Sequence, residues 1–304
     1  MSTDAPMVLP ERQAYFRELS EVPAISRPAL LLFLLALATG ITAARAAVAG
    51  DIPMWCASIV NGICLYFFFT IMHEALHRTV SSTLWLNEIL GRLSLAFLIP
   101  GAPLEVARWV HLKHHGNTTC DDDPDNFMHH GPWWKLIWRW ANFDVYYIVH
   151  FYRFAGVVAK RHTPKVIISF TVFALIVGAT IAAGYGMELL WLWFIPSRIG
   201  LALVGFVFVF LPHYPADISA REDKFQATTI RLGWEWLLTP LMGYQNYHLI
   251  HHLYPNVPFY NYLKIWHLKY DELFAQGPAV QSAFGLMPLK RAGLDPVFAR
   301  RKAS

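Results

Sequence analysis

The chain has 304 residues, of which 55% are hydrophobic and only 15% charged, whereas about 25% of the residues of an average soluble domain are charged. This composition excludes an ordinary soluble domain, and the net charge of +4 without any run of Lys or Arg excludes a nucleic-acid-binding protein. Three cysteines, Cys56, Cys64 and Cys120, do not make a disulfide framework, which predicts free thiols in a reducing compartment.

The first 27 residues mix acidic and basic side chains, unlike a signal peptide, which has a basic start and a short apolar core. We therefore expect residues 1–27 to form a polar cytoplasmic arm, with an interfacial helix near residues 11–20.

Four apolar stretches are long enough to cross about 30 Å of hydrocarbon, which takes roughly 20 helical residues. They lie at about 28–48, 53–72, 165–184 and 189–211. Only a few residues join the first span to the second and the third to the fourth, which predicts two helical hairpins. Neither hairpin tip contains Lys or Arg, so the positive-inside rule places both tips outside and the rest of the polar chain in the cytoplasm.

The segments 84–103 and 132–154 are apolar but contain charges, and the second also contains many tryptophans and tyrosines. Such segments are typical of helices at the membrane surface. We predict an all-α integral membrane protein with four transmembrane helices in two hairpins and a helical cytoplasmic cap. Its membrane domain would span 28–270 and its cytoplasmic tail 271–304, with both termini cytoplasmic and, as the location, a bacterial inner membrane.

Eight of the fourteen histidines fall into three short boxes, and a ninth follows the fourth span. The boxes read HEALH, HLKHH and HLIHH, and their histidines are His73 and His77, His111, His114 and His115, and His248, His251 and His252. The ninth, His213, stands in the sequence LPHYPAD.

Residues three or four apart share one face of a helix, so each box directs its imidazoles to one side. Spans two and four both end on the cytoplasmic side, where the other two boxes also lie, so all nine imidazoles can converge there. Nine neutral imidazoles are too many for one ion but suit two ions. The spacing alone does not choose the metal, because imidazole binds zinc, copper, iron and nickel.

The first box also matches H-E-x-x-H, the signature of zinc proteases. An intramembrane zinc protease needs a third protein ligand and an open position on the metal. Asp217 is a candidate for that ligand, but the other histidines would then have no role. This reading stays open as an alternative, with Glu74 otherwise expected near the ligands or at the surface.

Taken together, the HxxxH, HxxHH and HxxHH boxes and the four spans resemble the membrane fatty acid desaturase and hydroxylase superfamily, over about residues 60–270. The resemblance implies two non-haem irons held by the nine histidines, with O₂ as co-substrate. It also implies that Asn246, before the third box, holds a water or orients a neighbour. In the acidic run after the second box, Asp121 and Asp125 are candidates to accept hydrogen bonds from ligand imidazoles.

The sequences around the second and third boxes and His213 look most like those of carotene ring hydroxylases. The resemblance thus implies oxygen-dependent oxidation of a C–H bond in a long lipid-soluble substrate, with a carotenoid ring favoured and fatty-acyl desaturation as the alternative. The substrate would enter from the bilayer. Because no cytochrome-b5-like domain is found in the chain, we expect a separate electron donor such as ferredoxin or cytochrome b5.

Overall fold

The structure is a computed structural model that describes residues 9–289, and most of these residues are helical. Four helices are long and apolar enough to cross a membrane: α2 (Arg27–Ala49), α3 (Met54–His77), α8 (Val157–Ala182) and a helix over Gly186–His213. The last of these consists of α9 (Gly186–Leu189), α10 (Ile195–Val204) and α11 (Leu211–His213), joined by π-helical turns. The four helices overlap the four predicted spans, and α8 begins eight residues earlier than predicted.

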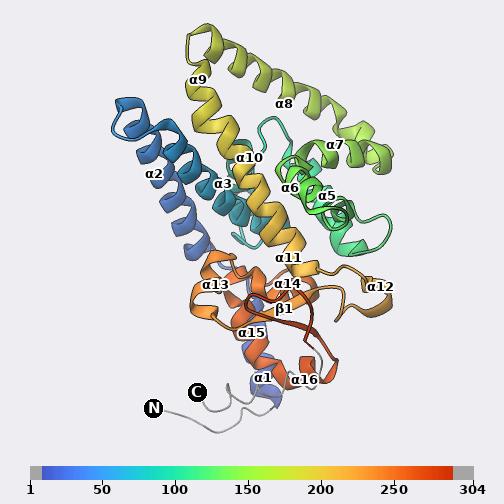
Figure 1. The fold of residues 1–304 in the computed structure, drawn as a ribbon. Coiled ribbons are helices and arrows are strands. Elements are labelled where there is room, and N and C mark those ends of the chain that lie inside the picture. The colour runs from blue at the N-terminus through green and yellow to red at the C-terminus, as the bar shows by residue number, and fades with distance from the viewer. Residues whose placement is uncertain (1–8, 290–304) are drawn as a thin grey trace.

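The central helix is α3, which packs against α2, α4 (Leu84–Leu98) and α10. In its most apolar stretch 56% of the residues are buried, compared with 6% for α8. Figure 1 shows why: α8 extends away from the bundle at one end, whereas α2, α3 and α10 run side by side. The apolar face of α8 is therefore left for lipid.

Each pair of spans forms a hairpin with a short connection, as the sequence predicts. Gly50 ends α2 in a left-handed conformation with φ +85°, and its N–H donates back to Ala46 and Ala47. A residue with a side chain would be strained in this conformation. The chain then enters α3 four residues later.

Between the hairpins lie α4, α5 (Leu104–Asn117), a 3₁₀ turn (Pro124–Met128), α6 (Trp133–Ala141) and α7 (Phe143–Phe154). The two segments predicted as surface helices correspond to α4 and to the pair α6 and α7. Arg198 of α10 donates to both carboxylate oxygens of Asp144 at 3.0 and 2.7 Å, which fixes the start of α7 against the fourth span.

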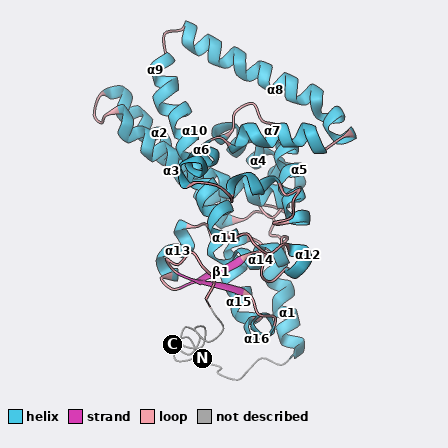
Figure 2. Ribbon diagram, turned by 45° about the vertical axis from the view of Figure 1, so that its right-hand side comes forward, coloured by secondary structure: helices cyan, strands magenta, loops and turns pink. Residues whose placement is uncertain are grey.

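The rest of the chain forms a cap of short elements beside the ends of α3 and α11 (Figure 2). Its helices are α12 (Ala220–Asp223), α13 (Glu235–Leu241), α14 (His248–Leu253), α15 (Tyr262–Leu268) and α16 (Tyr270–Ala275). The helix α1 (Leu9–Ser20) packs on α15, and the Asn261 side chain donates to the Leu19 carbonyl at 2.9 Å.

The cap also contains a two-stranded parallel sheet of β1 (Thr229–Leu232) and β2 (Ala279–Ser282), with Thr229 opposite Ala279. The Arg231 guanidinium donates to carbonyls of Ser282 and Gly285, so it ties the segment directly after β2 to the sheet. Residues 271–289, which the sequence places in a cytoplasmic tail, thus include α16 and the buried strand β2.

A close approach of α6 to the fourth span gives a test of this packing. A Cβ on Gly205 would lie 2.6 Å from Cβ and 2.9 Å from Cα of Trp140. We expect Gly205→Ala to lower the free energy of unfolding by about 1–3 kcal/mol, because backbone must move to relieve the overlap. Gly178→Ala is the control, since a Cβ there meets no atom within 4 Å. Melting temperatures in detergent would compare the two, and equal values would contradict the packing.

Candidate metal centre

The nine predicted histidines come from four helices that end or pass at one place. His73 and His77 lie on the last two turns of α3, and His213 ends α11. The second box lies on α5 and the third on α14, which is supported by β1 and α15. The expected convergence of the boxes is what the structure has.

Their ring nitrogens form two groups of four in which the ligand atoms lie within 4.8 Å of one another. The first group is His73, His77, His111 and His251, and the second is His114, His213, His248 and His252. His115 lies between them, within the same distance of His251 and His252. Each group takes nitrogens from three separate parts of the chain. Neither group therefore arises merely from the regular spacing of histidines on a single helix.

Within the groups the Nε2 atoms face one another. His77 Nε2 is 2.6 Å from His111 Nε2, and His115 Nε2 is 2.9 Å from His251 Nε2. In the second group, His252 Nε2 is 3.0 Å from His248 Nε2 and 3.3 Å from His114 Nε2. Converging imidazole nitrogens of this kind are a donor set for a transition metal or zinc.

The outer nitrogens are held by the protein. His213 Nδ1 donates to the Val209 carbonyl at 2.7 Å, and His248 Nδ1 donates to Gln245 Oε1 at 2.5 Å. His251 Nδ1 is 2.8 Å from the Tyr262 hydroxyl. Where the partner is a carbonyl, the hydrogen must be on Nδ1, which leaves the Nε2 lone pair facing the group, as metal binding requires.

Electrostatics favour the neutral imidazoles that metals bind. For five of them, burial lowers the pKa well below its usual value, and neighbouring imidazoles lower it further: His111, His115, His248, His251 and His252. Burial also lowers the pKa of His114, but Asp123 and Asp125 outweigh it and raise that pKa to about 9. Since Asp123 holds Nδ1, Nε2 of His114 stays directed at the second group. The residues present therefore fit two metal ions.

Of the three further candidates, the structure brings only Asp125 beside a histidine of the groups. Its Oδ2 lies 3.4 Å from His114 Nδ1. Asn246 is buried next to the third box, and its Nδ2 donates to Thr239 Oγ1 at 3.1 Å. The Asp121 side chain is exposed, because the hydrogen bond from Asp123 N to Cys120 O makes a turn with residues 121 and 122 at its tip.

Within the acidic run, Asp123 is the residue that holds His114, since its Oδ1 and Oδ2 lie 3.0 and 3.1 Å from His114 Nδ1. The sequence reasoning missed three other residues near the histidines. Gln245 precedes His248 by three residues, a helical spacing that could have revealed it. Tyr262 gives no such signal. His129 is buried, and its ring centroid lies 5.3 Å from that of His213. It is not three or four residues from another histidine, so its spacing gives no signal.

Glu74, the acidic residue of the HEALH sequence, is buried, and its Oε1 lies 3.7 Å from His73 Nδ1, beyond a good hydrogen bond. Its Oε2 accepts from Thr79 Oγ1 at 2.7 Å and from Phe259 N at 3.1 Å. Among the described residues it therefore links the first box to the loop after the third. This use of the carboxylate disfavours a general base poised on a metal-bound water.

Replacing Glu74 tests that assignment. We expect Glu74→Ala to lower the free energy of unfolding by about 1–3 kcal/mol, because it leaves the buried Phe259 N–H without its acceptor and leaves the Thr79 hydroxyl only the backbone carbonyl of residue 74. Glu74→Gln keeps an acceptor oxygen and should lose less. Thermal unfolding of both variants would measure the difference, and a Glu74→Ala protein as stable as the native one would contradict the link.

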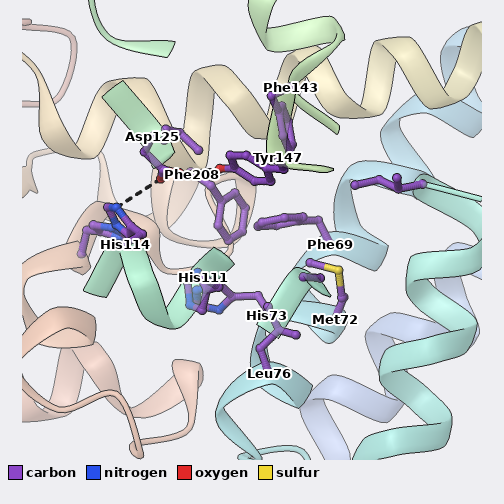
Figure 3. A pocket seen from close by; sticks show the side chains of 14 residues that line it. Phe69, Met72, His73, Leu76, His111, His114, Asp125, Phe143, Tyr147 and Phe208 are labelled. Atoms are coloured by element: carbon purple, nitrogen blue, oxygen red, sulfur yellow. Dashed lines mark hydrogen bonds and ion pairs between the residues drawn. The ribbon is translucent and has the colours of Figure 1, made fainter. Parts of the chain in front are cut away.

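An apolar cavity opens onto both groups of histidines (Figure 3). Its walls include Phe69, Met72 and Leu76 of α3, Phe208 of the fourth span, and Phe143 and Tyr147 of α7. His73, His111, His114 and His248 lie at its base. These walls are apolar, and the cavity that they enclose has a volume of about 50 Å³.

Comparison with known proteins agrees with this site. The sequence model of the fatty acid desaturase family matches residues 51–284. A beta-carotene ketolase of Paracoccus sp. (strain N81106 / MBIC 01143) is 30% identical over 199 residues, which cover 63% of this chain and 70% of the ketolase. An sn-1 oleoyl-lipid 12-desaturase of Anabaena variabilis is 26% identical over 238 residues, 67% of this chain and 65% of that protein. The chloroplastic omega-6 fatty acid desaturase of Glycine max is 24% identical over 249 residues, 73% of this chain and 56% of that protein.

Proposed function

The chain belongs to the fatty acid desaturase family, and from this premise we propose that it oxidises a ring C–H bond of a carotenoid with O₂. The observation that carries the proposal is the pair of imidazole groups at the base of an apolar cavity. The resemblance to a beta-carotene ketolase favours a carotenoid over an acyl chain.

We assign the nine histidines as ligands of two iron ions, His115 being shared or bound to either one. When bound, the irons supply the reduction of O₂ and the removal of hydrogen from an unactivated carbon. The chain's own residues hold the imidazoles in one tautomer, exclude water and place the substrate carbon. In the cavity, Phe69 and Phe208 pack edge to face at 4.8 Å between ring centroids, a rigid wall for a flat ring.

We propose the membrane arrangement that the positive-inside rule predicts. We place the cap and the ends of α3 and α11 on the cytoplasmic side, with both hairpin tips opposite, and keep residues 28–270 as the membrane domain. A separate donor, a ferredoxin or a cytochrome b5, would deliver two electrons for each O₂ reduced. The substrate would enter the cavity sideways from the bilayer.

The test is expression of the full chain in a bacterial host that makes β-carotene, together with a ferredoxin and its reductase. Oxygenated pigments should appear, and fatty-acid composition should stay unchanged. New unsaturated acyl chains with unchanged pigment would contradict the proposal and favour the desaturase alternative, which two matching desaturases also support.

Metal analysis of the purified protein distinguishes the proposed oxidation from the remaining alternative, an intramembrane zinc protease. Two irons for each chain are expected. A single zinc for each chain, with neither lipid oxidised, would favour the zinc protease.

A further inference from the structure

Two buried carboxylates lie beside His114, although a single one would be enough to hold it. An imidazole bound to a metal through Nε2 has one hydrogen to donate, at Nδ1. Asp123 takes it, with its two oxygens at 3.0 and 3.1 Å, and also accepts from the backbone N–H groups of Thr119 and Asp125. Asp125 lies at 3.4 Å, beyond a good hydrogen bond. Asp125 is thus not needed to hold the ring of His114 in its orientation.

A buried carboxylate is costly, and the protein holds this one in place from a different side. The Tyr147 hydroxyl donates to Asp125 Oδ1 at 2.5 Å, from α7, a separate element. Figure 3 shows Tyr147 and Asp125 next to each other above His114, with the hydroxyl end of Tyr147 directed toward Asp125. The side chain of Asp125 is therefore fixed, with Oδ2 making only its distant contact to His114.

Both residues line the cavity, where they differ from every other described residue in its walls. The remaining lining residues are four histidines of the metal groups and eight apolar residues: Phe69, Met72, Leu76, Ile99, Ala107, Phe143, Phe208 and Val209. Apart from the four histidines, Asp125 and Tyr147 are thus the only polar side chains among the described residues that line the cavity. They lie next to the second metal group.

The hydrogen bonding of the pair defines what it can recognise. The carboxylate has only acceptors, and the Tyr147 hydrogen is already used on Asp125, which leaves acceptor lone pairs on both residues. A plain hydrocarbon gains nothing from acceptors, and a ketone has no hydrogen to donate. A hydroxyl group can donate to either oxygen.

We propose that Asp125 and Tyr147 bind a hydroxyl group of the substrate close to the carbon that is oxidised, so that a hydroxylated ring is preferred to the corresponding hydrocarbon. The proposal rests on the proposed function, since it concerns the substrate class of the same site. A hydrogen bond to a charged acceptor predicts a preference of about 10- to 100-fold.

The test compares β-carotene with the same pigment carrying one ring hydroxyl. Iron-loaded protein in lipid nanodiscs, with ferredoxin and its reductase, would receive both pigments in equal amounts, and the ratio of kcat/KM would be read from the products. Zinc-loaded protein, which cannot reduce O₂, would give the ratio of dissociation constants by pigment absorbance. Both ratios should favour the hydroxylated pigment.

Three variants locate the preference. Tyr147→Phe should lower both ratios by about tenfold, because the carboxylate is no longer fixed. Asp125→Asn replaces an acceptor by an amide that can donate, so the preference should move toward a ring ketone. Tyr146→Phe removes the same hydroxyl one residue away, from a ring that stacks on Phe127 at 4.1 Å between centroids, and should keep the native ratios.

Native metal content in a variant shows that it has folded. It also shows that the substitution affects binding of the substrate hydroxyl and not binding of the metal. Equal binding of the two pigments by the native protein would overturn the inference, as would an equal loss in Tyr146→Phe. Loss of metal from Asp125→Asn would also overturn it, because Asp125 would then serve His114. If neither pigment binds or reacts, the proposed function fails and the inference fails with it.

Discussion

Replacing His251 with alanine will abolish oxidation and release metal from the protein. His251 contributes a nitrogen to the first group and lies with His115 and His252 between the two groups. It is fully buried, and its Nδ1 lies 2.8 Å from the Tyr262 hydroxyl. His115 Nε2 lies 2.9 Å from His251 Nε2, but His115 is itself one of the nine assigned ligands, so the centre still loses one nitrogen. We expect turnover to fall at least about 1,000-fold, consistent with losing more than about 4 kcal/mol of stabilisation, and iron to fall well below two for each chain.

The measurements are iron content by plasma emission spectroscopy and pigment conversion in membranes. His130→Gln is a suitable control, since it also removes an imidazole but from an exposed position. It should keep native iron and turnover. A His251→Ala protein that retains both metal and activity would remove the basis of the assigned centre.

Replacing Asp123 with asparagine is expected to weaken metal binding about 10- to 100-fold, the usual effect of losing a carboxylate that orients a ligand imidazole. Asp123 is buried and accepts from His114 Nδ1, from Thr119 N at 2.7 Å and from Asp125 N at 2.9 Å. An amide has only one acceptor oxygen for these three donors. His114 should therefore lose its fixed orientation.

Competition with a metal chelator would measure the affinity, and iron would be lost first from the group that contains His114. Asp121→Asn changes the same functional group in the same acidic run, but at an exposed residue, and should leave affinity unchanged. Equal effects of the two substitutions would show that the charge of the loop, not the contact with His114, matters.

The sequence predicted the grouping of the histidines because its signals are local. Spacings of three and four residues put imidazoles on one helix face. The absence of Lys and Arg from both hairpin tips predicts that α3 and α11 end on the same side of the membrane. His213 was found in that way despite lying outside a box. The four long helices were equally clear, because a span needs a continuous apolar stretch that few other structures require.

The residues that hold the histidines in place could not be predicted from such local patterns. Tyr262 contacts His251, and Phe259 N donates to Glu74, only once the cap has folded. The strands Thr229–Leu232 and Ala279–Ser282 are only four residues each, too short for their sequence pattern to identify them, and they pair across a long stretch of chain. The sequence alone does not show which of the four aspartates at 121, 122, 123 and 125 are buried, because this depends on the turn that begins at Cys120.

The division of ligands between distant parts of the chain also constrains biosynthesis. Both groups need residues from the third box, and one of them also needs His73 and His77 from the second span. The first group is complete only once residue 251 has been translated, and the second only once residue 252 has been translated. Metal binding by a complete group is therefore a late step in maturation, and a nascent chain that stalls earlier exposes incomplete clusters of imidazoles to whatever metal the cell has free.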